Sequence, residues 1–244
     1  MKQLHTFLFF FNILVISGIY SQDKQTKSQD SVPRISARDT LPPAEKYGLR
    51  AGVDIARLVR SALDNNYTGF EIEGDYRIHR KIYIAGEVGN ESLIRDEENI
   101  NVEGSGTYIR AGFDYNVYDN WYGMQNSIYV GLRYGFSTFS QELNEYTIFT
   151  DNNFFGTDRI TDSIKQDGLN AGWLEFVFGL EVEVISNIYL GASLSLRTLV
   201  NESKPDGFDN LYIPGFGKTN DFNNIGVGYN YTISYLIPIA KRKR

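Results

Sequence analysis

A strict alternation of residue types constrains the fold of this chain more than any other feature. From Ile225 to Ile237 every odd position is a large apolar or aromatic residue, and the even positions are small or polar, with Leu236 as the exception. A period of two is that of a β-strand with two different faces. The run is longer than the five or six residues usual in soluble strands, and a transmembrane strand needs about 9–11 residues with one apolar face.

The alternation recurs along the chain and predicts eight antiparallel strands. They cover residues 47–59, 67–79, 82–92, 104–118, 126–139, 169–185, 188–200 and 221–238. Short connections (near 80–81, 119–125 and 186–187) alternate strictly with longer ones (near 60–66, 93–103, 140–168 and 201–220). This is typical of an outer-membrane barrel with short periplasmic turns and long extracellular loops.

A soluble β-sandwich is the alternative, because short strands with alternating faces suit both architectures. The polar faces here are rich in glycine and small residues, which fits a crowded barrel interior. Aromatic rings are expected in two girdles near the strand ends: Tyr47, Tyr76, Tyr83, Tyr118, Trp121, Tyr122, Tyr189 and Tyr235 at the periplasmic end, and Tyr67, Phe70, Phe136, Phe139, Trp173 and Phe222 at the other. We therefore predict an all-β fold, an eight-stranded antiparallel transmembrane β-barrel.

The ends of the chain predict export to the envelope. Residues 1–21 have a basic start and an apolar centre, as in a secretory signal peptide. Residues 22–45 are polar, hold three of the six prolines and are expected to form a flexible periplasmic segment. The barrel is expected over 46–240, followed by a basic tail at 241–244. The location predicted is the bacterial cell outer membrane, with outer-membrane lipid around the barrel.

Composition argues against several functions. The net charge is −6, and loss of Lys2 with the signal peptide takes it to about −7, so nucleic acid is an unsuitable partner. The chain has no cysteine, and His79 is the one histidine beyond the signal peptide. No Gly-x-Ser-x-Gly segment occurs. The sequence thus predicts a non-enzymatic protein with no catalytic residue, no cofactor and no metal site.

The inward faces of the predicted strands carry many charges. Nine are acidic and five basic: Arg50, Asp54, Glu71, Glu73, Asp75, Arg77, Glu87, Arg110, Asp114, Arg133, Glu175, Glu181, Glu183 and Arg197. Side chains can just fill an eight-stranded barrel, so these charges are expected to form a packed network of ion pairs. The alternative is a narrow conduit or ion site, and the excess of acids leaves room for trapped water or a bound cation.

Two of the longer connections have compositions that suggest a role in binding. Segment 140–168 is acidic, which is compatible with a solvated loop or with calcium binding, although its spacing matches no EF-hand or Asp-rich repeat. It also holds Phe149, Phe154 and Phe155, which are expected to fold over the barrel mouth or to contact a partner. Segment 201–220 mixes glycine, proline and aromatic residues, and long ordered loops often carry function.

The signal peptide ending in Ile19-Tyr20-Ser21-Gln22, the polar lead-in with its prolines and the Gly- and Tyr-rich strands resemble Bacteroidota outer-membrane β-barrel proteins, a family of small barrels of the OmpA/OmpX type. The resemblance brings no catalytic motif. It implies a structural or accessory subunit of an envelope complex, for example barrel assembly or secretion machinery. The alternatives are a narrow cation or small-solute conduit and an outer-membrane lipid-modifying enzyme using loop carboxylates.

Overall fold

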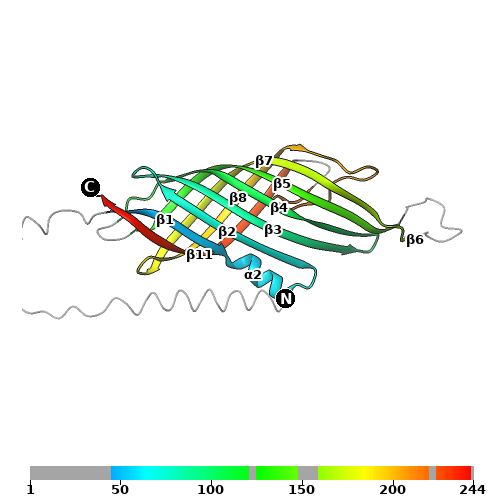
Figure 1. Ribbon diagram of the computed structural model, residues 1–244, viewed down its shortest axis with the longest axis horizontal. Coiled ribbons are helices and arrows are strands. Elements are labelled where there is room, and N and C mark those ends of the chain that lie inside the picture. Colours follow the sequence, from blue (N-terminus) through cyan, green and yellow to red (C-terminus); the bar gives the residue numbers. More distant parts are fainter. Residues whose placement is uncertain (1–44, 121–124, 148–158, 220–223, 243–244) are drawn as a thin grey trace, which may run out of the picture. The chain divides into compact units, whose positions relative to one another are not determined.

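The computed structural model describes residues 45–120, 125–147, 159–219 and 224–242. Their main feature is one antiparallel sheet that closes into a ring of eight long strands (Figure 1). The order around the ring is β4-β3-β2-β1-β11-β8-β7-β5, and pairing of β5 with β4 closes it. The long strands are β1 (Glu45–Asp54), β2 (Tyr67–Arg77), β3 (Ile82–Glu97), β4 (Ile100–Asn116), β5 (Ser127–Thr147), β7 (Ile164–Ile185), β8 (Ile188–Glu202) and β11 (Ile225–Arg242). A two-residue strand, β6 (Arg159–Ile160), extends the sheet beside β5.

The first expected strand, 47–59, ends early. Asp54 caps a nine-residue helix, α2 (Ile55–Leu63), by accepting a hydrogen bond from the amide of Ala56 at 2.8 Å. An aspartate at this position satisfies a backbone donor that the first helical turn leaves free. Alternation over 49–55 predicts the strand correctly, but residues 55–63 place their polar side chains three to four positions apart, which is the spacing of one helix face. No helix in the described part of the chain is long and apolar enough to cross a membrane.

Several strands are longer than the alternation indicated. β3 and β4 extend until only Glu98 and Asn99 connect them, so the expected long connection at 93–103 is wrong, and with it the strict alternation of loop lengths. β5 and β7 likewise extend into segment 140–168. β1 and β11 pair from Glu45 and Arg242 onward, so the sheet includes the first two residues of the expected basic tail. The phenylalanines 149, 154 and 155 lie outside the described residues.

The outer face of the ring is apolar along a belt that ends abruptly. Val88, Ile109 and Phe136 are successive partners on β3, β4 and β5, and their side chains are 40–56% exposed. One step further along the strands, Asn90, Thr107, Thr138 and Asn170 form the next outward row across β3, β4, β5 and β7. Outward residues from Ile109 to Val117 on the β4 side span eight steps of about 3.3 Å, which is about 20 Å along the barrel axis at a tilt near 40°.

The polarity of the inner face also changes at the level where the belt ends. Beside the apolar belt the interior is charged, with Arg110 next to Ile109 along β4. Beyond the belt the interior holds an apolar core beside the buried Glu91. The core groups Tyr108, Phe139, Leu169, Ala171, Trp173, Leu199, Ile213 and Phe216. Strand ends with polar outward residues and apolar inward residues have the pattern of a water-exposed β-protein.

Part of this core comes from segment 203–219. Its two short strands, β9 (Tyr212–Ile213) and β10 (Gly217–Lys218), form a hairpin whose Ile213 and Phe216 side chains are 0% and 2% exposed. The ring of Phe216 meets Trp173 edge-on, with centroids 5.9 Å apart. The aromatic girdles are therefore partly wrong: Tyr67, Phe139, Trp173 and Tyr189 are buried, at 0–3% exposure. These rings are buried because the odd-numbered residues of β5, β7 and β8 point into the barrel.

Candidate functional site

The centre of the barrel is a cluster of ion pairs around Arg110, whose side chain is 1% exposed. Its guanidinium Nη2 lies 2.5 Å from both Glu71 Oε2 and Glu87 Oε2, and Nη1 lies 3.0 Å from Glu175 Oε1. Glu71 also accepts hydrogen bonds from the Tyr108 hydroxyl and from Asn230 Nδ2, the latter at 2.6 Å. Burial of charges is tolerated only when they are paired, and each of these carboxylates has the Arg110 guanidinium beside it.

The network continues from this centre toward the end of the barrel that holds the β2–β3 turn. Arg133 pairs with Glu87 and, at 2.9 Å, with Asp114. Arg50 pairs with Asp75 at 2.7 Å and with Glu181. The remaining link lies at the edge of the barrel, where Lys46 Nζ lies 3.2 Å from Glu183 Oε1.

The fourteen charged residues that the sequence placed inside are buried or half-buried in the structure. Ten of them are buried, namely Arg50, Asp54, Glu71, Glu87, Arg110, Asp114, Arg133, Glu175, Glu181 and Arg197. The other four, Glu73, Asp75, Arg77 and Glu183, are half-buried. The structure thus brings the central members into direct contact and leaves the half-buried ones toward one end.

Sequence reasoning missed two charged members of the interior. Arg57 comes from α2, and its guanidinium Nε lies 3.1 Å from both Asp54 Oδ2 and Glu71 Oε2. Glu91 pairs with the same guanidinium and accepts from the hydroxyls of Tyr67 (2.7 Å) and Tyr212 (2.8 Å). Glu91 shares the odd parity of Glu87 on β3, so alternation alone could have found it. Arg57 could not be found that way because it belongs to a helix.

The hairpin is fixed to this part of the network. Besides the Tyr212 hydroxyl, the amide of Gly215 donates to Glu91 Oε2 at 2.8 Å, and Arg197 Nη1 donates to the carbonyl of Phe216 at 3.0 Å. Burial raises the pKa of the Tyr212 phenol well above its ordinary value, so the group stays protonated as a donor. One buried carboxylate therefore joins α2, β2, β3 and the hairpin.

The ring has a gap in its wall beside α2. The last pair between β1 and β11 is Asp54 with Thr232, and the last pair between β1 and β2 is Val53 with Ile72. Residues 225–231 of β11 and 67–71 of β2 consequently have no strand beside them on that side. The helix covers this gap: Ser61 Oγ accepts from the amide of Gly69 at 2.7 Å and donates to its carbonyl at 3.0 Å, as a neighbouring strand would.

The helix is amphipathic, with its polar face toward the barrel interior and its apolar face outward. Its inward face carries Arg57 and Ser61, while Leu58, Val59 and Leu63 point away from the barrel at 40%, 49% and 81% exposure. This matches the polarity of the strands on either side. The helix therefore continues the wall, apolar outside and polar inside.

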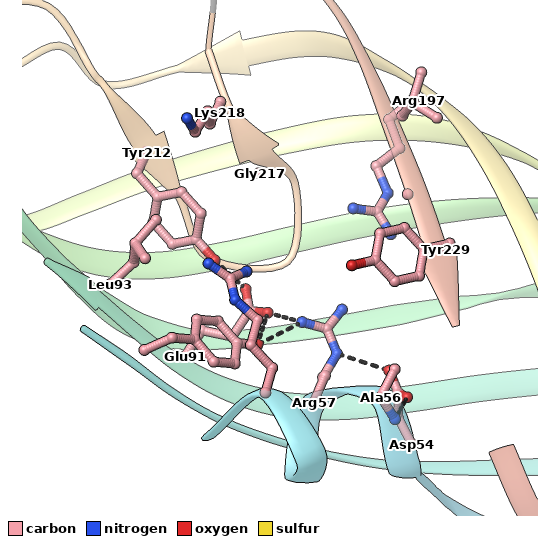
Figure 2. A pocket seen from close by; sticks show the side chains of 14 residues that line it. Asp54, Ala56, Arg57, Glu91, Leu93, Arg197, Tyr212, Gly217, Lys218 and Tyr229 are labelled. Carbon is pink, nitrogen blue, oxygen red and sulfur yellow. Dashed lines mark hydrogen bonds and ion pairs between the residues drawn. The ribbon is translucent and has the colours of Figure 1, made fainter. Parts of the chain in front are cut away.

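A cavity of about 170 Å³ lies between α2, β11 and the hairpin (Figure 2). Four basic residues (Arg57, Arg60, Arg197, Lys218) and two acidic ones (Asp54, Glu91) line it, together with Tyr67, Leu93, Tyr212, Val227, Gly228 and Tyr229. Val227 and Tyr229 are outward residues, at 74% and 60% exposure, whereas Arg197 faces inward at 4%. The cavity thus joins the interior to the outer surface through the gap.

His79 is exposed in the turn after β2, away from the carboxylate network. Within the described ranges, no three His, Asp or Glu side chains are grouped so as to hold a metal ion. The chemistry that the interior offers is ion pairing and hydrogen bonding.

Comparisons with known proteins add a family and a distant fold likeness. A family model described as Domain of unknown function (DUF6048) matches residues 4–242. No curated protein matches. Among solved structures, the crystal structure of Ail, the attachment invasion locus protein of Yersinia pestis, is 13% identical, covers 80% of this chain and 97% of its own, and has a TM-score of 0.37. Ail in complex with the heparin analogue sucrose octasulfate is 16% identical over 78% and 94%, with a TM-score of 0.35.

Proposed function

Because the chain belongs to the family described as Domain of unknown function (DUF6048), its role has to be inferred from its own geometry, and we propose a non-enzymatic β-barrel of the bacterial outer membrane that acts through protein–protein contacts. Such a barrel would serve as a structural or accessory subunit of an envelope complex, for example barrel assembly or secretion machinery. The Bacteroidota origin stays a prediction.

The observation that carries the membrane assignment is the inversion of both faces at one level. Next to Ile109 on the outside stands Arg110 on the inside, and next to Thr107 on the outside stands Tyr108 on the inside. A soluble protein keeps its charges outside along the whole strand, and soluble monomers seldom expose continuous apolar patches above about 600 Å². Hydrocarbon around the belt accounts for the apolar residues outside and the charged residues inside at that level. Water beyond the belt accounts for the polar residues outside and the apolar residues inside.

The filled interior favours contacts over transport. Eight strands enclose a space that side chains can just fill, and here Arg110, Arg133 and their carboxylates occupy it. At one end the hairpin adds the buried side chains of Ile213 and Phe216. What remains available to a partner is the apolar wall and the strand ends beyond the belt, and the sequence adds Phe149, Phe154 and Phe155 as candidate contact residues.

Purification from native membranes tests the proposal. Membranes of the native organism are solubilised in mild detergent, and the tagged chain is isolated together with bound proteins. We expect recovery in the outer-membrane fraction, a faster electrophoretic mobility before boiling than after, and at least one partner at a fixed stoichiometry. Recovery of the mature chain as a monodisperse protein in detergent-free buffer would contradict the membrane assignment.

The same preparation separates the alternatives. Stable cation-selective current steps in a planar bilayer would favour a conduit over an accessory subunit. Turnover of membrane lipid that is lost on Asp162→Ala would favour an enzyme, because that loop residue is an exposed carboxylate outside the interior network.

A further inference from the structure

The cavity at the gap beside α2 is lined by basic side chains to which the proposed function assigns no role. We propose that the cavity between α2 and β11 binds the phosphate-bearing headgroup of a membrane lipid, which enters sideways from the bilayer. This inference rests on the outer-membrane location proposed above, and it assigns a ligand to a site within that barrel.

The first argument is the position of the opening. Tyr229 and Val227 lie on β11 opposite Leu194 and Leu196 of β8, all four with outward apolar side chains. On the other side of the gap, Phe70 of β2 pairs with Asn90, in the first polar row beyond the belt. The opening therefore spans the level at which the apolar belt ends, and this is the level of lipid headgroups.

The second argument is the attachment of α2. On the β2 side Ser61 makes two hydrogen bonds to Gly69, and the Arg60 guanidinium lies 3.9 Å above the Tyr67 ring. On the β11 side the Tyr231 amide donates to Asp54 Oδ1, the N-cap of the helix, at a longer distance of 3.4 Å. The cavity lies along this second, weaker seam.

The third argument is the charge of the lining. Four basic side chains and two acidic ones line the cavity. Arg57 and Arg197 are also paired, with Glu71 and Glu175. The exposed basic side chains of the lining are those of Arg60 and Lys218. Lys218 is exposed at the rim, and within the described ranges it has no ion-pair partner. Basic groups at a membrane surface attract anionic lipid headgroups.

The fourth argument is an unused donor inside the cavity. Arg197 donates through Nε to Glu175 at 3.2 Å and through Nη1 to Phe216, but its buried Nη2 has no hydrogen-bond partner among the described residues. A buried donor without a partner destabilises the folded state, so a ligand that supplies an acceptor there is favoured. Guanidinium groups bind phosphate oxygens well, so a phosphate in the cavity would supply the missing acceptor.

Gly228 keeps this donor in place. It lies directly over the guanidinium of Arg197, and a Cβ atom on residue 228 would overlap Nη2 and Cζ. The cavity is also smaller than the roughly 300–1,000 Å³ of pockets that enclose drug-sized ligands. It can therefore take a headgroup while the acyl chains stay outside, along Val227, Tyr229 and the apolar face of α2.

The test is lipid binding to the full-length mature chain in detergent, measured by native mass spectrometry. The probes are phosphatidylglycerol and diacylglycerol with the same acyl chains, which differ by the phosphate headgroup. We expect at least tenfold tighter binding of phosphatidylglycerol. The double variant Arg60→Ala, Lys218→Ala is expected to weaken that binding at least fivefold.

Matched controls separate the site from general charge. The double variant Arg159→Ala, Lys165→Ala removes two exposed basic side chains elsewhere on the chain and should leave binding within twofold. Gly228→Ala keeps every charge but displaces Arg197, and it should also weaken phosphatidylglycerol binding. Each variant is first shown to be folded by its mobility before boiling.

Three outcomes would overturn the inference: equal binding of the two lipids, equal loss in both double variants, or competition by millimolar glycerol 3-phosphate as effective as that of the lipid. The last would assign the site to a soluble phosphate. If the chain is not a membrane barrel, it will not be recovered in the outer-membrane fraction and will not show heat-dependent mobility. Failure of the proposed location can therefore be distinguished from failure of the proposed lipid site.

Discussion

Thr107 and Ile109 are consecutive residues on the outer face of β4, and the polarity of this part of the barrel wall changes between them. Their partners on the neighbouring strands change in the same way, from Asn90 to Val88 on β3 and from Thr138 to Phe136 on β5. The inward neighbours change in the opposite direction, from Tyr108 to Arg110. A boundary shared by several strands is a property of the surroundings, since no single strand requires it.

This boundary predicts how charge is tolerated along β4. Phe113, at 59% exposure, is central to the belt, and Phe113→Arg should destabilise the barrel by about 2–4 kcal/mol in phospholipid vesicles. Thr107→Arg, on the same face but beyond the belt, should cost at most about 1 kcal/mol. Urea unfolding in vesicles gives both values, and equal costs would argue against a hydrocarbon boundary at this level.

Arg110 is predicted to be the most sensitive member of the ion-pair network. Arg110→Met leaves Glu71, Glu87 and Glu175 with fewer compensating charges in the interior, so we expect a loss of about 3–5 kcal/mol in the free energy of unfolding. The control is Arg159→Met, which removes a 54% exposed partner of Glu145 and should change stability by less than about 1 kcal/mol. A difference below 1 kcal/mol between the two variants would show that the central pairs contribute little.

Gly135 is predicted to be required by the ring of Trp173. The two residues are cross-strand partners, and a Cβ atom on residue 135 would overlap the indole, which is 0% exposed and packed against Phe216. Gly135→Ala should cost about 1–3 kcal/mol through overpacking. Gly86→Ala, where the nearest atom to the new Cβ is the Arg110 carbonyl oxygen at 3.7 Å, should be close to neutral. Unfolding followed by tryptophan fluorescence compares them.

Ser61 is predicted to hold α2 against β2. Ser61→Ala removes both hydrogen bonds to Gly69, so the seam should weaken by about 1–2 kcal/mol. The measurement is hydrogen exchange at the Gly69 amide, which should speed up roughly 5- to 30-fold. Thr68→Ala, on the exposed face of the same strand, serves as control and should leave that exchange rate unchanged. If Ser61→Ala also leaves the rate unchanged, the helix is held by other contacts.

The alternation in the sequence determined which residues of the ring point inward, because the period of a strand is two whatever its surroundings. Of the fourteen charged residues expected inside, ten are buried and four are half-buried. What alternation could not supply is the end of a strand, since residues 93–103 continue as β3 and β4 up to a two-residue turn. Likewise, ring residues such as Trp173 and Phe139 looked suited to an interface, but inward parity buries them.

Only the tertiary structure decided the rest. Whether residues 55–63 form a helix depends on the gap that a short β1 leaves between β2 and β11, and that gap exists only once the ring has closed. The same holds for the hairpin at 212–218, whose apolar residues gain burial from strands distant in the sequence, and for Arg57, which reaches Glu71 and Glu91 from outside any strand. Local periodicity can be recognised from consecutive residues. Contacts across a closed sheet cannot, because they join residues that are more than a hundred positions apart, such as Glu91 with Tyr212 and Glu71 with Asn230.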